Sequence, residues 1–174
     1  VNRSALTKQV AKNYLQELMN EGQIFSAGYG FYSTSMKEFI LPKHNRVEKI
    51  RQKLKKQFPF TEFIVWNTIQ LQSFYHHMQT HHITFVETIS DAVVPFSEII
   101  SDDYKEVMVE KRSRLYYEFD IRKDPVVVKK LVQRSPVKGY MPALEKILID
   151  LFFYKDSYNL MGYSDYYEML EGIY

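Results

Sequence analysis

The sequence has no cysteine, few glycines and prolines, and no long apolar run. Among its 174 residues, glycine and proline occur six times each. The absence of cysteine excludes disulfides and thiolate-bound metals, and it is typical of proteins from a reducing cytoplasm. No stretch approaches the roughly 18 apolar residues of a membrane-spanning helix, and the polar start is unlike a signal peptide. We therefore expect a cytoplasmic protein that does not contact a membrane.

Several motifs of known enzyme classes are also missing. The chain contains no P-loop, no dinucleotide-binding glycine pattern and no G-x-S-x-G motif of serine hydrolases. It does contain 14 tyrosines and 12 phenylalanines, within the overall composition of an ordinary globular protein. Such an aromatic content favours aromatic packing or an interface. We expect a folded protein that is not an enzyme and that binds no cofactor.

Charge is distributed unevenly along the chain. Residues 1–60 carry a net charge of +7, whereas residues 61–174 carry −5. A basic front favours an anionic partner for that part of the chain, such as nucleic acid.

The stretch from Ser4 to Tyr32 predicts a helix followed by a two-stranded ribbon. Ser4 is a suitable N-cap, and Gly22 is the first helix-breaking residue after it. Gly28 and Gly30 can adopt the positive φ of a tight hairpin turn. The apolar residues of the helix share one face: Val10, Ala11, Tyr14, Leu15 and Leu18. The opposite face carries side chains suited to phosphates and base edges: Lys8, Gln9, Lys12, Asn13 and Gln16.

A helix followed by a ribbon is the second half of a winged helix-turn-helix, and an ordinary amphipathic helix beside a hairpin is the alternative interpretation. A winged domain has two helices before its recognition helix, but the chain starts with Val1 close to the helix cap. We therefore expect that an N-terminal segment is missing.

A second, strongly basic helix is predicted over residues 46–58. Its apolar stripe comprises Val47, Ile50, Leu54 and Phe58. Its outer face is either a second phosphate-contacting surface or a solvated face, and the solvated face is the favoured interpretation because basic runs are not specific. The outer residues are Arg46, Lys49, Arg51, Lys53, Lys55 and Lys56.

Beyond Phe60, short strands alternate with helices. Strands are predicted over residues 61–66, 82–88, 104–110, 115–121 and 125–131. Helices are predicted over residues 67–78, 91–100, 141–154 (with Pro142 in its first turn) and 162–174 (capped by Ser164). This order predicts an α/β (α+β) fold in which helices lie on the faces of a mixed sheet. We expect a partial winged helix over residues 1–41 and an α/β domain over residues 42–174.

Several of these segments resemble AbiEi-type antitoxins, the winged-helix regulators of bacterial abortive-infection (type IV) toxin–antitoxin pairs. In the front part, the resemblance lies in YLQELMNEGQIFSAGYGFYSTS, which is similar to the end of their winged domain. In the second part, it lies in the order of the segments FIVWNTIQLQSFYHHMQTHHITFVET, YKEVMVE, DPVVVKKLVQRSPVKG and MPALEKILIDLF. The best matches are Trp66–Thr68, Glu87 and Pro142–Asp150.

The resemblance implies a DNA-binding transcriptional regulator that represses its own operon. It also implies an antitoxin that opposes a nucleotidyltransferase-like toxin encoded beside it, with operator double-stranded DNA as the binding partner. Combined with the helix pattern, it predicts these DNA-binding residues: Ser4, Lys8, Gln9, Lys12, Asn13, Gln16, Gly28, Tyr29, Gly30 and Tyr32.

Two alternative functions remain open. The first is a metal-dependent nuclease or phosphoryl-transfer enzyme over residues 60–155, with Glu87 as its best candidate, although a structural hydrogen bond is the favoured role for Glu87. The second is a protein-interaction module that uses the aromatic residues near 152–167. The other groups considered for the enzyme are Asp91, Asp102, Asp103, Glu106, Glu110, Lys111 and Asp120.

Two further groups of polar residues are best interpreted without a metal. The histidines lie in the span HHMQTHH (His76, His77, His81 and His82), where His77 and His81 have the four-residue spacing of two metal ligands on one helix. Because no obvious third ligand precedes Glu87, we expect a polar helix end. On the helix over 141–154, Lys146 and Asp150 have the spacing of an ion pair, and Glu145 favours the helix start. We predict no catalytic and no metal-binding residue.

Overall fold

A computed structural model describes residues 8–28, 31–34, 40–74, 81–110, 121–132, 137–158 and 160–173. The chain divides into two compact units, residues 1–40 and residues 41–173. The predicted mixed α/β class is confirmed, since helices accompany a four-stranded mixed sheet and small antiparallel pairs. Some predicted features lie outside the described residues: Ser4, Tyr29, Gly30, His76, His77, Lys111, Asp120 and residues 115–120 of a predicted strand.

The first unit contains one described helix and a ribbon. Helix α1 (Lys8–Asn20) is followed by β1 (Phe25–Gly28) and β2 (Phe31–Ser33), which pair antiparallel. Gly22 ends the helix with a φ of +69°, and its N–H donates to the Met19 carbonyl at 3.1 Å. The Gln23 N–H donates to the Leu18 carbonyl at 2.9 Å, which completes a Schellman motif. The order of helix, glycine stop and ribbon is therefore confirmed, whereas the winged-helix arrangement stays a prediction.

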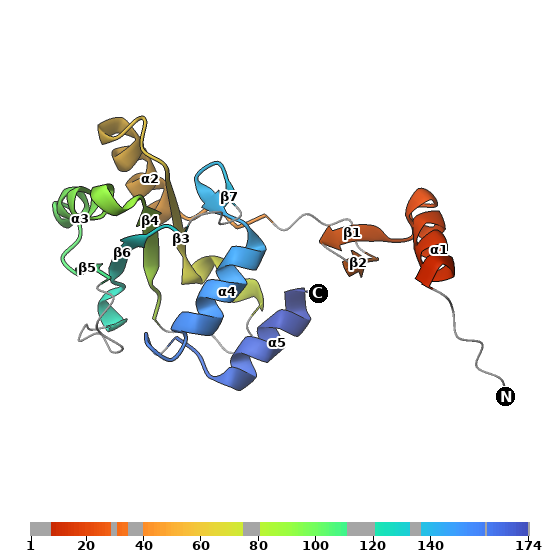
Figure 1. The fold of residues 1–174 in the computed structure, drawn as a ribbon. Coiled ribbons are helices and arrows are strands. Elements are labelled where there is room, and N and C mark those ends of the chain that lie inside the picture. The colour runs from red at the N-terminus through yellow and green to blue at the C-terminus, as the bar shows by residue number, and fades with distance from the viewer. Residues whose placement is uncertain are drawn as a thin grey trace. The chain divides into compact units, whose positions relative to one another are not determined.

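The second unit is built on a four-stranded sheet in the order β3-β4-β6-β5 (Figure 1). Its strands are β3 (Phe63–Asn67), β4 (Thr84–Thr88), β5 (Val107–Val109) and β6 (Val126–Lys130). The β3–β4 pair is antiparallel, whereas β4–β6 and β5–β6 are parallel. A small hairpin of β7 (Val137–Lys138) and β8 (Met141–Pro142) lies beside β3, where the Val65 N–H donates to the Tyr140 carbonyl at 3.1 Å.

Helices cover both faces of this sheet, as predicted (Figure 1). One face is covered by α2 (Asn45–Gln57) and α3 (Val93–Ser101), and the other by α4 (Leu144–Tyr154) and α5 (Tyr163–Ile173). Successive side chains of a strand point to opposite faces. The core under α2 and α3 therefore contains alternate strand residues, which pack on helix residues such as Leu54 and Phe96. The strand residues in this core are Phe63, Val65, Val86, Val126 and Val128.

The structure corrects three local predictions. Residues 67–78 do not begin as an α-helix but as the 3-10 helix η1 (Thr68–Phe74). Asn67 and Gln70 cause this, since the Ile69 N–H donates to Asn67 Oδ1 and the Asn67 N–H donates to Gln70 Oε1, both at 2.8 Å. Such side-chain bonds compete with those of an α-helix.

The other two corrections concern helix starts. Pro142 does not lie in the first turn of α4, because it pairs with Val137 in the β7–β8 hairpin and α4 begins at Leu144. Ser164 does not cap α5, which begins at Tyr163. Instead, the Gly162 N–H donates to Asp165 Oδ2 at 3.2 Å, so an acidic side chain in the first turn stabilises this end.

The predicted strands over 61–66, 82–88, 104–110 and 125–131 and the predicted helices over 46–58, 91–100, 141–154 and 162–174 are confirmed with small shifts of their ends, whereas Ile121, the one described residue of the strand predicted over 115–121, lies in a 3-10 helix. The helix predicted over 91–100 consists of the short 3-10 helix η2 (Ser90–Ala92) and α3, and a third 3-10 helix, η3 (Ile121–Lys123), precedes β6. Among the described residues, none of the helices has the length and apolar character needed to cross a bilayer.

The core between α2, α3 and the sheet supplies a stability prediction. Phe96 is fully buried and contacts Phe58 and Phe63, with ring centroids 4.7 and 5.5 Å away. We expect Phe96→Ala to lower the free energy of unfolding by roughly 3–5 kcal/mol, because it leaves a cavity. Val94→Ala on the exposed side of α3 is the control, and we expect an effect below about 0.5 kcal/mol in urea denaturation. Equal effects of the two substitutions would contradict this packing.

Candidate functional site

The polar face predicted for DNA binding lies on α1 and is open to solvent. Its five described residues, Lys8, Gln9, Lys12, Asn13 and Gln16, are all exposed. The apolar face of α1 is also largely open, since Val10 and Tyr14 are 50% and 60% exposed and no side chain of the helix is fully buried.

Two amide side chains of this face are joined. Gln9 Nε2 donates a hydrogen bond to Asn13 Oδ1 at 3.0 Å across one turn of the helix. This contact uses Nε2 of Gln9 and Oδ1 of Asn13, so Gln9 Oε1 and the Asn13 Nδ2 amide group take no part in it. On the ribbon, Gly28 ends β1 and Tyr32 in β2 is 41% exposed.

Most of the positive charge at the front of the sequence lies in the second unit. Residues 1–40 carry a net charge of only +1, whereas residues 41–60, which include α2, carry +6. The charge argument for the first unit is therefore weaker than the sequence suggested.

Several cations of α2 have partners inside the second unit. Lys53 Nζ lies 2.7 Å from Asp103 Oδ2 and 3.3 Å from Asp102 Oδ2. Arg51 pairs with Glu48, Arg46 donates to the Asp124 carbonyl, and Lys55 lies over the ring of Tyr140. Lys49 and Lys56 remain exposed. These contacts favour a mainly structural role for the basic face of α2.

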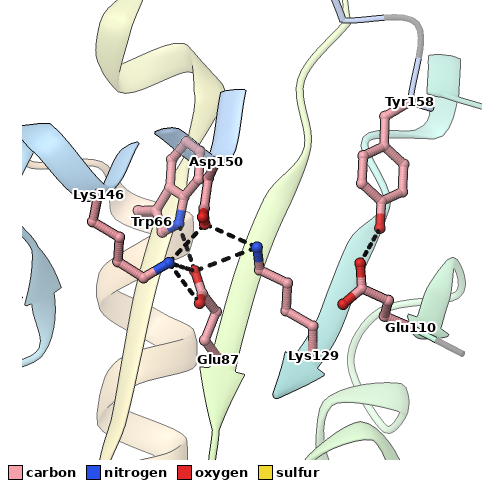
Figure 2. Close-up of polar contacts among 7 residues, drawn as sticks. All are labelled: Trp66, Glu87, Glu110, Lys129, Lys146, Asp150 and Tyr158. Carbon is pink, nitrogen blue, oxygen red and sulfur yellow. Dashed lines mark hydrogen bonds and ion pairs between the residues drawn. The ribbon is translucent and has the colours of Figure 1, made fainter. Parts of the chain in front are cut away.

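Four charged side chains form a buried ring between the sheet and α4 (Figure 2). Glu87 comes from β4, Lys129 from β6, and Lys146 and Asp150 from α4. Lys146 Nζ lies 2.7 Å from Glu87 Oε2 and 2.7 Å from Asp150 Oδ2. Lys129 Nζ lies 2.9 Å from Asp150 Oδ2 and 3.8 Å from Glu87 Oε1. In this charge ring, each lysine faces both carboxylates.

The charge ring is electrically balanced, and three of its four side chains are buried while Asp150 is 13% exposed. Glu87 is fully buried, and both lysines are less than 5% exposed. Burial raises the pKa of Glu87 despite the two lysines. Burial also raises the pKa of Asp150, but the ammonium groups of Lys129 and Lys146 outweigh it and hold that pKa below its ordinary value. Two positive and two negative groups offer no net charge to a ligand, so the arrangement is suited to holding α4 on the sheet.

The two predictions made for these residues from sequence are confirmed. Lys146 and Asp150 form the expected ion pair across one helical turn. Glu87 accepts a hydrogen bond from Trp66 Nε1 at 3.3 Å, the structural role favoured for it. Lys129 was missed, because no local spacing connects it to Glu87; the parallel register that places them side by side appears only in the fold.

The carboxyl ends of the parallel strands gather polar groups. Glu110 follows β5, and the Tyr158 hydroxyl donates to Glu110 Oε1 at 3.4 Å (Figure 2). Burial, together with the negative charge of Glu110, raises the pKa of Tyr154 strongly. Ligands of α/β proteins often bind at this edge of a sheet. However, other carboxylates of the nuclease hypothesis lie elsewhere: Asp102 and Asp103 pair with Lys53, and Glu106 pairs with Lys123.

A second polar cluster, absent from the sequence-based predictions, surrounds Asp124. The His82 N–H donates to Asp124 Oδ1 at 3.2 Å, and Arg46 donates to the Asp124 carbonyl. Asp124 has a φ of +48°, an uncommon conformation for a residue other than glycine. Burial lowers the pKa of both His44 and His82; Arg46 lowers that of His44 further. Both shifts favour the neutral imidazole.

The described residues in and around this cluster do not group into a metal site. Within the part of the chain that the structure describes, no three His, Cys, Asp or Glu side chains lie close enough together to hold a metal ion. Arg46 stacks on Tyr104, 4.7 Å from the ring centroid. Both residues line an open pocket of about 470 Å³, in which Lys123 pairs with Glu106.

Comparison with known proteins places the chain in a family. One family model matches residues 10–174, from the first turns of α1 to the end of the sequence. The chain belongs to DUF6577, a family of unknown function. No curated protein and no solved structure matches the chain. The matched range of this DUF6577 protein contains Lys12, Asn13 and Gln16 of the polar face of α1. It also contains all four residues of the charge ring.

Removing one member of the charge ring tests its contribution to folding. We expect Lys146→Met in this DUF6577 protein to lower the free energy of unfolding by about 3–5 kcal/mol, because Glu87 loses its closest cation while buried. The double variant Lys146→Met/Glu87→Gln removes one charge of each sign and should recover part of that loss. Urea denaturation measures both, and a double variant less stable than the single one would contradict the ring's charge balance.

The lowered pKa of Asp150 predicts an acid-dependent effect. A carboxyl whose pKa is lower in the folded state stabilises the fold above its ordinary value of about 3.9, and this contribution is lost as the pH falls through the folded-state value. We therefore expect Asp150→Asn to destabilise the protein at pH 7 and to approach the wild type below about pH 4. Urea denaturation at several pH values between 7 and below about 4 measures the difference. Glu98→Gln, at an exposed carboxylate of α3, is the control. A difference in stability between Asp150→Asn and the wild type that does not change with pH would contradict the lowered pKa of Asp150.

Proposed function

We propose that this DUF6577 protein is a cytoplasmic DNA-binding transcriptional regulator and the antitoxin of a bacterial toxin–antitoxin pair. The observation that supports DNA binding best is the joined amide pair Gln9–Asn13 on an exposed helix face that also carries Lys8 and Lys12. The face lies on a helix that is followed by a two-stranded ribbon, the order found in the second half of a winged domain.

The chemistry of this face fits a base edge in the major groove. Adenine offers an amino donor at N6 beside an acceptor at N7, and side-chain amides match this pattern. With Gln9 Nε2 bonded to Asn13, Gln9 Oε1 would accept from N6 while Asn13 Nδ2 would donate to N7. Lys8, Lys12 and Gln16 would contact phosphates and neighbouring bases, and Tyr32 would lie near the backbone as part of the wing.

The antitoxin role rests on the resemblance to AbiEi-type regulators. Under this proposal the protein represses its own operon through operator DNA. The second unit would carry the activity that opposes a nucleotidyltransferase-like toxin encoded by the neighbouring gene. Coexpression with that gene product tests this part separately from DNA binding.

DNA binding is tested with the duplex that lies upstream of the protein's own gene. We expect Gln9→Ala and Asn13→Ala each to weaken binding by about 1–3 kcal/mol and to relax base preference. Lys12→Ala should weaken binding to any sequence and reduce the slope of log affinity against log salt by about 0.9, because one phosphate contact is lost. Fluorescence anisotropy at several salt concentrations measures both effects.

Lys49→Ala is the matched control, since it removes an exposed lysine from α2. If Lys49→Ala reduces the salt slope and Lys12→Ala does not, then α2 rather than α1 contacts DNA. If neither the amide variants nor Lys12→Ala alters binding, the assignment to α1 is wrong. A reporter under the protein's own promoter should be derepressed by the triple variant Gln9→Ala/Lys12→Ala/Asn13→Ala.

A further inference from the structure

Helices α4 and α5 expose large apolar side chains on the side away from the sheet. Ile149 and Phe153 on α4 are 56% and 69% exposed, and Phe152 is 40% exposed. Tyr163 and Tyr167, one turn apart on α5, are each 56% exposed. We call these five residues the aromatic face.

Contacts within and between α4 and α5 fix the positions of the side chains of the aromatic face. Phe152 lies 5.8 Å from Phe153 and 6.4 Å from Tyr163 between ring centroids, so the rings of the two helices adjoin. Tyr166, which is buried, donates from its hydroxyl to the Leu148 carbonyl at 3.1 Å and so ties α5 to α4. Lys155 Nζ lies under Tyr163, 3.5 Å from its ring centroid, and pairs with Asp156 at 2.8 Å.

The segment that forms this face exposes charge of one sign. Between Ala143 and Ile173 the cations are Lys146 and Lys155, and both are buried. Apart from Asp150, which belongs to the charge ring, the exposed or half-buried charges of this segment are therefore all acidic: Glu145, Asp156, Asp165, Glu168 and Glu171. An apolar centre with an acidic rim is complementary to a surface that is apolar in its centre and basic at its edges.

We propose that the aromatic face binds a basic amphipathic helix of a partner protein, with leucine-like side chains on the aromatic rings and lysine or arginine beside the acidic rim. Helix-in-groove recognition of this kind uses apolar anchors at helical spacing. The acidic rim would repel a second copy of the same face, an anionic membrane and nucleic acid, and it attracts cationic peptides. This binding activity is additional to DNA binding by α1.

The probe is a fluorescent synthetic helix with leucines on one stripe and lysines elsewhere, titrated with the full chain. We expect saturable binding that weakens as salt increases. Phe153→Ser and Tyr167→Ser should each weaken it by about tenfold or more, because they remove exposed anchors without touching the core. Val94 on α3 is 55% exposed, so Val94→Ser is the matched control and should leave binding unchanged.

Three outcomes would overturn the proposal. A peptide of the same composition in shuffled order could bind as tightly, which would show that charge alone drives the association. The Val94→Ser variant could lose affinity as much as Phe153→Ser. Sedimentation could show a dimer of the protein that Tyr167→Ser converts to a monomer, which would assign the face to self-association. Loss of DNA binding by α1 variants would leave this result unaffected, so the two proposals fail independently.

Discussion

The second unit depends on the four charges that join its sheet to α4. The β4–β6 register sets Glu87 beside Lys129, and α4 supplies Lys146 and Asp150 to complete the ring. Around it, Trp66 and Phe85 stack at 4.7 Å and add the apolar cover that keeps water out. A balanced ring of this type contributes less to net stability than an apolar core would, but it permits few alternative positions of the helix. The aromatic face, on the outer side of the same helix, therefore has a defined position relative to the sheet.

The two units use their helices in opposite ways. In α2, three apolar residues are buried and four of the six cations have carboxylate, carbonyl or aromatic partners within the unit. In α1, the polar and apolar faces are both open, and a Schellman end rather than core packing defines where it stops. A helix of this length is marginal in water without tertiary contacts. Contacts with a further surface, such as the groove of DNA, would stabilise α1, which is consistent with a role in binding.

Local patterns allowed much of the fold to be predicted, and non-local pairing explains the rest. The β-branched runs of β3, β4 and β6 and the apolar stripe of α2 were apparent because each is encoded within a few residues. The Lys146–Asp150 pair followed from helical spacing in the same way. By contrast, Lys129 beside Glu87, and Arg46 and His82 around Asp124, are brought together by strand order, which no short pattern encodes. The positive charge at the front was counted over residues 1–60, and most of it lies on α2, which the packing of Val47, Ile50 and Leu54 places with the sheet.

The strand order also determines when the protein can fold during synthesis. Strand β5 leaves the ribosome before β6, the strand with which it pairs, and α4 follows later still. Until α4 emerges, Glu87 and Lys129 must stay hydrated, so the sheet face that carries them cannot become dry. Nascent chains that end before α4 therefore expose an unfinished apolar sheet and are candidates for chaperone binding or proteolysis. The earlier strands therefore reach their final packing only after α4, in the last third of the chain, has been synthesised.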